Sequence, residues 1–322
     1  MYAGSIPTLA STQTHLARVA ELVDAADLKS AGRKAVQVQV LFRAPPVCGI
    51  HLFLAETVDA RLAAHSFEYA CRTAVRYREA MPRLVENLLS PSLDWYEIRD
   101  AFRKNTYTIV DDLMQAEAAE VIYECLQTDV PWEAAYREKG VDKSVPVSEL
   151  AKLSPDQQNQ LHQNVIKEAS EDYQFFFLRY PMIDAYVAGR DPGLLLHKLT
   201  EFLNSEHFLN FVRYITDDDG IRKSEAMATL YEPGHFLKNH DDLQYFDNED
   251  RRCACVLQLS KDWVPDWGGN LIFTSGSEHE FGITPKFNQF AIFRVPHDHH
   301  VSYVAPYATK PRYTITVFLR AD

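Results

Sequence analysis

A His-x-Asp pair followed much later by a run of histidines is the most chemically informative feature of the sequence. His240 and Asp242 form the pair, and His297, His299 and His300 form the run. Side chains two residues apart on an extended strand point to the same side, so His240 and Asp242 can meet one metal ion. Two histidines and one carboxylate on one face of iron(II) leave three coordination positions open. The sequence therefore predicts an iron site that one of the later histidines completes.

An arginine near the end of the chain could bind a dicarboxylate beside that metal. Arg312 begins a predicted strand, and a guanidinium can bind a carboxylate through two parallel hydrogen bonds. A single His-x-Asp match is common in solvated loops, and an isolated arginine is usually a surface charge. The order is much more specific, because His299 follows His240 by 59 positions and Arg312 follows His299 by 13.

Short strands in the second half of the chain must position these residues. From Ala226 to Leu319 short apolar runs alternate with Gly, Pro, Asp and Asn clusters. Strands at such spacing are typical of a β-sandwich or jelly roll. The predicted strands are Ala226–Tyr231, Ala254–Leu259, Asn270–Phe273, Gln289–Phe293 and Tyr313–Leu319.

The preceding region is predicted to be mainly helical. After a short strand at Tyr107–Ile109, the predicted helices are Gln115–Leu126, Ser154 to about Asp172, Leu194–Leu203 and Phe208–Ile215. Ser154 followed by proline is typical of a helix start. The aromatic segment Tyr173–Phe177 is predicted to be core. Because helices precede strands, we expect an α+β fold with helices packed on one face of the sheet.

The ordered motifs resemble the prolyl-hydroxylase branch of the 2-oxoglutarate/iron(II) oxygenases, both the oxygen-sensing and the ribosomal-protein prolyl hydroxylases. The likeness is strong over roughly the last two-fifths of the chain and loose over Tyr107–Ile215. The stretches that carry it are Tyr231–Asp242, Arg252–Trp263, Gly268–Leu271, Pro285–Asn288, His299–Val304 and Tyr307–Val317. The resemblance implies a double-stranded β-helix, Fe(II), 2-oxoglutarate and O2 as cosubstrates, and ascorbate as a candidate reductant.

The family pattern also implies which histidine binds the metal. It places valine two residues after the distal ligand and an apolar residue five after it, which His299 satisfies with Val301 and Val304. His300 is the alternative. The expected metal ligands are therefore His240, Asp242 and His299.

The cosubstrate contacts follow the pattern less completely. The resemblance assigns Arg312 to the far carboxylate of 2-oxoglutarate, and Thr314 would face the same side of the strand. Gln258 stands where the family often has a tyrosine, although a glutamine can still donate a hydrogen bond. Tyr231 is then the better candidate for a phenolic contact. No general base or nucleophile is expected beyond the iron ligands.

The expected activity is hydroxylation of an unactivated C–H bond, and several alternatives remain open for the substrate and the class. A prolyl residue of a protein or peptide is the first choice, and a free amino acid or small metabolite is the second. A non-catalytic jelly-roll binding protein would leave the complete set of ligands without a purpose. A zinc hydrolase would leave Arg312 and the stretch Trp267–Gly269 unexplained.

Composition excludes several partners. The net charge is −12, and residues 81–322 hold 24 basic and 38 acidic residues. Such an acidic body is a poor binder of nucleic acid or anionic membrane, and would suit a basic protein or peptide. Five irregularly spaced cysteines, with no segment typical of a signal peptide, favour free thiols in the cytoplasm. The sequence does not indicate an oligomeric state.

Residues 1–80 differ from the rest of the chain. They carry nine basic and seven acidic residues, and the segment Val19–Pro46 looks like a conceptual translation of a transfer-RNA gene. We therefore expect a misassigned start or a disordered extension, with translation beginning near Met81. The alternative is a genuine amphipathic extension. Residues 81–322 are the expected oxygenase domain, with its jelly-roll core at about 226–320.

Overall fold

The computed structural model describes residues 88–243, 250–276 and 278–322. The expected N-terminal extension, 1–80, lies outside these ranges, so its interpretation stays a prediction. Within the described residues, no helix is long and apolar enough to cross a membrane.

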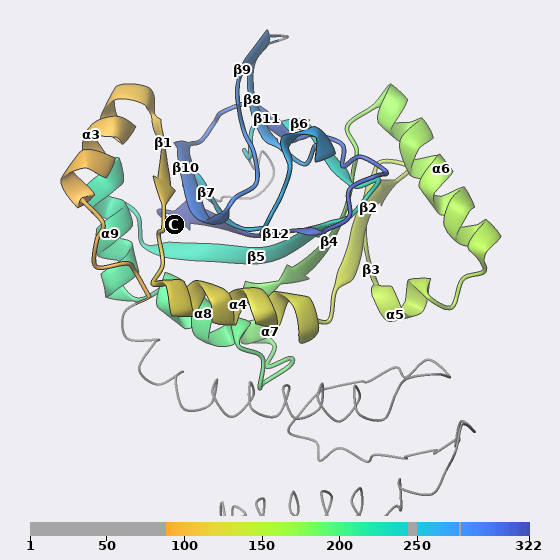
Figure 1. Ribbon diagram of the computed structural model, residues 1–322, viewed down its shortest axis with the longest axis horizontal. Coiled ribbons are helices and arrows are strands. Elements are labelled where there is room, and N and C mark those ends of the chain that lie inside the picture. The colour runs from red at the N-terminus through yellow and green to blue at the C-terminus, as the bar shows by residue number, and fades with distance from the viewer. Residues whose placement is uncertain (1–87, 244–249, 277) are drawn as a thin grey trace, which may run out of the picture. The chain divides into compact units, whose positions relative to one another are not determined.

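Eight strands of the second half form a jelly roll (Figure 1). They are β5 (Lys223–Tyr231), β6 (Phe236–His240), β7 (Arg251–Leu259), β8 (Leu271–Ser275), β9 (Glu278–Ile283), β10 (Phe287–Arg294), β11 (His299–Val301) and β12 (Arg312–Arg320). They belong to one curled antiparallel sheet, in which one half has the order β10-β7-β12-β5 and the other half β6-β11-β8-β9. The chain passes repeatedly between the two halves, which is the jelly-roll topology. The predicted α+β class with a double-stranded β-helix is confirmed.

Further strands extend this core. β1 (Tyr107–Asp111) pairs with β10, and β4 (Phe175–Pro181) pairs with both β5 and β6. A hairpin of β2 (Glu133–Glu138) and β3 (Val141–Pro146), which the sequence did not reveal, joins the edge of β4. The aromatic segment predicted to be core is largely β4, whose Phe175 and Phe177 are buried.

Helices cover the outer face of the sheet. Figure 1 shows α4, α7 and α8 below β5 and β12, α3 and α9 at one end, and α5 and α6 at the other. Their bounds are α3 Trp95–Asn105, α4 Ala116–Thr128, α5 Val147–Leu150, α6 Pro155–Glu171, α7 Met182–Val187, α8 Leu196–Leu203 and α9 Glu206–Thr216. The predicted start of α6 is confirmed by a capping box, in which Ser154 and Gln157 each bind the other's backbone N–H.

Residues alternate between two environments along the central strands. The outward residues of β7, such as Cys253, Cys255 and Leu257, join the large apolar cluster under the helices. Ala254 and Val256 point inward to a second cluster between the sheets. Burial raises the pKa of the Cys253 thiol to about 12, so the thiol stays protonated and packs as a small apolar group.

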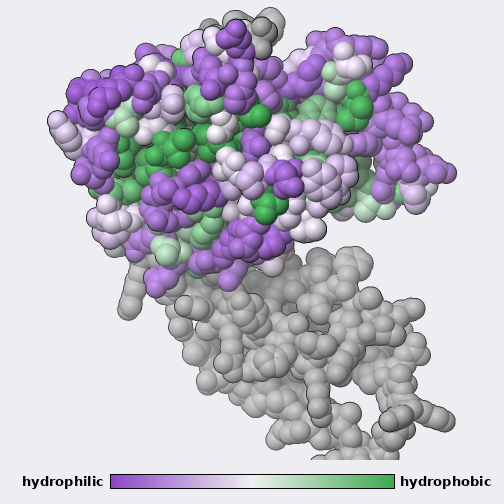
Figure 2. All heavy atoms as spheres, turned by 45° about the horizontal axis from the view of Figure 1, so that its top comes forward, coloured by the Kyte–Doolittle hydropathy of each residue, from purple (hydrophilic) through white to green (hydrophobic). Residues whose placement is uncertain are grey.

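The surface has a mixed character. Figure 2 shows hydrophilic side chains over most of the described part, with apolar side chains gathered in a band between them. Scattered exposed apolar residues are normal on folded proteins, but a contiguous band is a candidate contact surface.

Candidate metal centre

Strands β6 and β11 bring the three predicted ligands together. His240 ends β6 and pairs in register with His299, which begins β11. Asp242 follows β6 by two residues, with its backbone in the left-handed region at a φ of 63°. Its carboxylate oxygens lie 3.2 Å from Nε2 of His240 and 3.4 Å from Nε2 of His299. One ligand atom from each residue lies within 4.8 Å of the others, which is suitable for a single ion.

Backbone carbonyls fix the orientation of both imidazoles. Nδ1 of His240 lies 3.0 Å from the carbonyl oxygen of Lys238, and Nδ1 of His299 lies 2.8 Å from that of His297. A carbonyl oxygen only accepts hydrogen bonds, so each Nδ1 carries the proton and each Nε2 keeps its lone pair. This arrangement is usual for metal-binding histidines. The donor set therefore fits a divalent iron ion.

Burial and charge adjust the ionisation of these groups. Burial, together with the neighbouring His240, lowers the pKa of His299 to about 4, although Asp242 acts in the opposite direction. Burial alone would raise the pKa of Asp242, but the charges of His299, His240 and Arg251 outweigh it and lower that pKa. Near neutral pH the site thus presents a neutral His299 imidazole and an ionised Asp242 carboxylate. Burial would lower the pKa of His240, but Asp242 outweighs burial and raises that pKa, so metal binding must displace a proton from His240 when it is charged.

Arg312 is a buried cation without an acidic partner. Its side chain is 1% exposed, and its guanidinium lies 4.9 Å from the ring centroid of Tyr231. Nε has no hydrogen-bond partner, and no carboxylate among the described residues forms an ion pair with this guanidinium. Burial lowers the pKa of Arg312 to about 10. Because an unpaired buried charge is costly, this pocket fits an anionic ligand.

The other predicted cosubstrate residues line the same inner surface. Arg312 pairs with Tyr231 across β12 and β5, and Thr314 pairs with Gln258 on β7 and with Thr229 on β5. Directly paired residues of antiparallel strands face the same side. Thr314 and Thr229 share a hydrogen bond between hydroxyls, and Oε1 of Gln258 is buried without a partner.

Residues 226–320 match the family model described as the 2OG-Fe(II) oxygenase superfamily. Over these residues, which hold the cluster of His240, Asp242 and His299, the chain is similar to the 2OG-Fe(II) oxygenases. No curated protein sequence is similar enough to count as a relative.

Several solved structures are similar to the chain at low sequence identity. A prolyl 4-hydroxylase of Pseudomonas putida is 16% identical over 71% of this chain and 99% of its own, with a TM-score of 0.45. A 2OG-Fe(II) oxygenase family oxidoreductase of Burkholderia pseudomallei is 12% identical over 73% and 96%, with a TM-score of 0.47. A Trichoplax adhaerens prolyl hydroxylase, solved with a hypoxia inducible factor peptide, is 15% identical over 70% and 89%, also at 0.47.

Two adjacent glycines allow close packing beside Arg312 and Tyr303. A Cβ on Gly268 would lie 2.1 Å from the carbonyl oxygen of Tyr303, which no side chain could tolerate. A Cβ on Gly269 would lie 3.3 Å from Cδ of Arg312 and 3.1 Å from the Trp263 ring. Both glycines also have positive φ, which favours glycine. Gly269 therefore lies against the aliphatic part of the Arg312 side chain, and Gly268 lies against the backbone of Tyr303.

The structure places the alternative histidines outside the ligand set. His300 pairs with Ile272 on β8 and is half-buried, and His297 lies 3.1 Å from Glu280. Neither belongs to the group of residues that converge on one ion. His299 is therefore the distal histidine that the geometry favours.

Sequence reasoning missed two residues beside the centre. Tyr173 was predicted to be core, but its ring lies 6.1 Å from the His240 ring and its pKa is raised by burial and by Asp242. Thr229, which bonds Thr314, was not considered. It lies two residues before Tyr231 on the same strand, so the period of two could have revealed it.

Proposed function

We propose that His240, Asp242 and His299 bind Fe(II) and that Arg312 anchors the far carboxylate of 2-oxoglutarate. The main observation that supports this proposal is that a convergent His/Asp cluster lies in the same jelly roll as a buried guanidinium with no acidic partner among the described residues. Thr314, Tyr231 and Gln258 line the pocket around the dicarboxylate and supply hydroxyl and amide groups.

The protein's own residues would hold the metal ion and the cosubstrate and keep water away from them. Bound Fe(II) and 2-oxoglutarate supply the oxidation, in which O2 places one oxygen atom in a C–H bond and the other in succinate as CO2 leaves. The three ligands leave coordination positions open, and Arg312 orients the cosubstrate. Phe273 and Phe293 pack against the ring of His299 and keep that side of the centre dry. No side chain has to act as a general base.

We propose a prolyl residue of a protein or peptide as the substrate. The motif series from Tyr231 to Val317 is specific for the 2-oxoglutarate/iron(II) oxygenases as a whole, and its resemblance to the prolyl-hydroxylase branch suggests this substrate. The partly exposed side chain of His240, at 21%, leaves the centre within reach of a residue presented from the surface. The acidic charge of the chain favours a basic segment around that prolyl residue.

Succinate formation tests the proposal directly. The protein is supplied with Fe(II), 2-oxoglutarate and O2, and succinate is measured with proline-containing basic peptides, with matched alanine peptides and with free amino acids. We expect turnover that depends on the peptide proline, together with a mass increase of one oxygen atom on that residue. Turnover with free amino acids alone would instead establish the small-metabolite alternative.

A further inference from the structure

Arg251 is turned toward the metal centre by an irregularity in β7. Along most of their length β7 and β12 pair residue by residue, with Leu319 opposite Cys253. The next pair is Arg320 with Arg251, so Arg252 is an extra residue in β7. Such a bulge reverses the side to which the following side chains point. Arg251 therefore lies on the inner side of the sheet, instead of facing the helices as Cys253 does.

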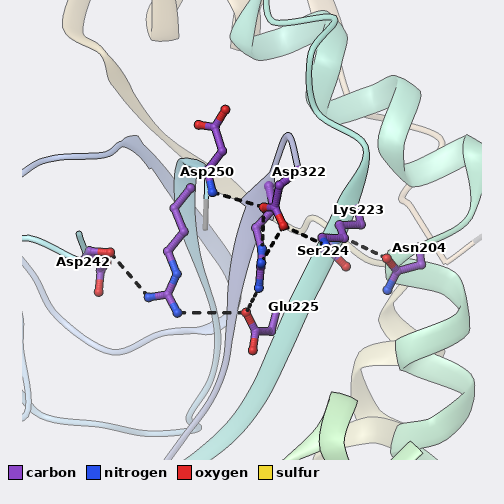
Figure 3. Close-up of polar contacts among 9 residues, drawn as sticks. Asn204, Lys223, Ser224, Glu225, Asp242, Asp250 and Asp322 are labelled. Carbon is purple, nitrogen blue, oxygen red and sulfur yellow. Dashed lines mark hydrogen bonds and ion pairs between the residues drawn. The ribbon is translucent and has the colours of Figure 1, made fainter. Parts of the chain in front are cut away.

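On that inner side Arg251 bridges strands β5 and β12 and the segment after β6 that holds Asp242, here called the metal loop. Figure 3 shows Asp242 and Glu225, two of the residues that it joins. Its Nη1 donates a long hydrogen bond of 3.4 Å to the backbone carbonyl of Asp242. Its Nη2 lies 4.0 Å from the carboxylate of Glu225 on β5. Its guanidinium lies over the ring of Phe318 on β12, 3.8 Å from the centroid. The side chain is only 10% exposed, so these contacts are shielded from water.

Asp242 needs such a contact more than the other two ligands do. His240 and His299 belong to paired strands, and each imidazole is also bonded through Nδ1 to a backbone carbonyl. Asp242 lies beyond the end of β6, with a φ of 63° that non-glycine residues adopt at a cost. The carbonyl and the side chain of Asp242 branch from one Cα, so the backbone conformation of this residue affects where the carboxylate lies. A donor against that carbonyl favours the conformation in which the carboxylate meets both imidazoles.

We propose that Arg251 is a positioning residue for the metal centre, holding Asp242 in its ligand conformation through the backbone. This inference rests on the proposed function, because it takes Asp242 as a ligand. Arg251 bonds the backbone carbonyl of Asp242, whereas the guanidinium of Arg312 lies over Tyr231 on another part of the inner surface. Its loss should therefore weaken metal binding while leaving the site for 2-oxoglutarate intact.

The C-terminus stabilises Arg251 in turn. Arg320 donates to the same Glu225 carboxylate at 3.0 Å and binds Asp322 through two of its nitrogens, at 3.0 and 2.7 Å. Lys223 also reaches Asp322, at 3.0 Å. Positive and negative groups thus alternate from the metal loop to the last residue (Figure 3). Glu225 contacts both Arg251 and Arg320. Replacing it should therefore weaken the support of Arg251 without changing a residue of the metal loop.

Metal binding without turnover tests this role. Mn(II) is titrated into the full-length protein without O2, and free Mn(II) is followed by electron paramagnetic resonance. Loss of a group that orients a metal ligand typically costs about 10–100-fold in metal affinity. We expect a weakening in that range for Arg251→Gln, less for Arg251→Lys, and a few-fold for Glu225→Gln. The KM for 2-oxoglutarate at saturating metal should stay within about twofold of wild type.

Arg252→Gln is the matched control, because Arg252 is the neighbouring arginine and its side chain binds Asp250 instead of the metal loop. Its Mn(II) affinity should equal that of wild type. Equal affinity in Arg251→Gln and wild type would overturn the positioning role while leaving the metal site intact. Should Arg251→Gln fail to fold, an unchanged Mn(II) affinity in Glu225→Gln would overturn it. A wild-type protein that binds no Mn(II) would instead refute the metal site, and this inference with it.

Discussion

Strands β7, β12 and β5 carry two chemically opposite rows of residues one position apart. Leu257, Ile315 and Ala228 form a cross-strand row that packs under the helices. Gln258, Thr314 and Thr229, the adjacent residues, form a row that faces the interior beside Arg312. A shift of one residue in register would exchange the two rows. The comparison teaches that one set of strand pairings fixes both the core and the cosubstrate pocket.

The two rows contribute oppositely to stability. The outer row removes apolar surface from water and stabilises the fold. The inner row and the neighbouring Arg312 bury an amide oxygen and a guanidinium nitrogen that have no hydrogen-bond partner among the described residues, and both destabilise the protein until a ligand binds. The stability contributed by apolar burial on the outer face thus offsets the destabilisation caused by the buried polar groups on the inner face. The predictions below separate the two contributions.

The largest effect is expected at the metal. Asp242→Ala removes the only carboxylate from the ligand set, so succinate formation should fall by more than the ~100-fold that loss of a supporting group costs. Circular dichroism should show an unchanged fold. His300→Ala is the control and should retain turnover. Loss of turnover in His300→Ala with full activity in His299→Ala would show that the distal ligand is His300.

The next largest effect is expected on the outer row. Ile315 is fully buried under the helices, so Ile315→Ala should lower the free energy of unfolding by about 2–5 kcal/mol. Urea unfolding measures this change. The KM for 2-oxoglutarate of the folded fraction should not move. A large rise in that KM at unchanged stability would contradict the separation of the two faces.

Arg312 should show the reverse pattern. Arg312→Met removes charge-assisted hydrogen bonds to the carboxylate, each contributing about 1.5–3 kcal/mol, so the KM for 2-oxoglutarate should rise at least ~10-fold. Because the substitution also removes a buried unpaired charge, the melting temperature without 2-oxoglutarate should not fall. Arg312→Lys keeps the charge but loses the planar fork and should also raise the KM. An unchanged KM in both variants would place the anchor elsewhere.

The smallest effect is expected for His235, a buried histidine with a hydrogen-bond partner, and it concerns how stability depends on pH. Nδ1 of His235 accepts the backbone N–H of Glu232 at 3.0 Å, and burial lowers the pKa of His235 to about 4. The unfolded chain, with a pKa near 6.5, binds more protons between pH 6.5 and 4. Stability is therefore present above pH 6.5 and lost as the pH falls toward 4, by at most about 1.4 kcal/mol per pH unit.

Urea unfolding at pH 7, 6 and 5 measures this dependence on pH. His235→Gln keeps an acceptor for the Glu232 N–H but does not titrate, so its stability should depend less on pH. Identical slopes in the two proteins would show that another group is responsible.

The amino-acid sequence by itself determined the elements with a clear period and the residues with distinctive chemistry. Short apolar runs between clusters of turn residues revealed β5, β7, β8, β10 and β12, and Ser154 with its proline revealed the start of α6. These signals depend only on neighbouring residues, so they can be recognised without knowledge of the fold. The hairpin of β2 and β3 gave no such signal, because β3 is largely exposed and lacks an apolar alternation.

Only the tertiary structure decided how the centre is supported. The register of β6 and β11 brings His240 opposite His299 across 59 residues of chain, which no local pattern encodes. Tyr173 was indistinguishable in sequence from its buried aromatic neighbours, yet it lies beside the ligands. The bulge at Arg252 turns Arg251 inward, although a strict period of two predicts the opposite side. Each of these depends on pairing between distant segments, and that pairing is set by the packing of the whole domain.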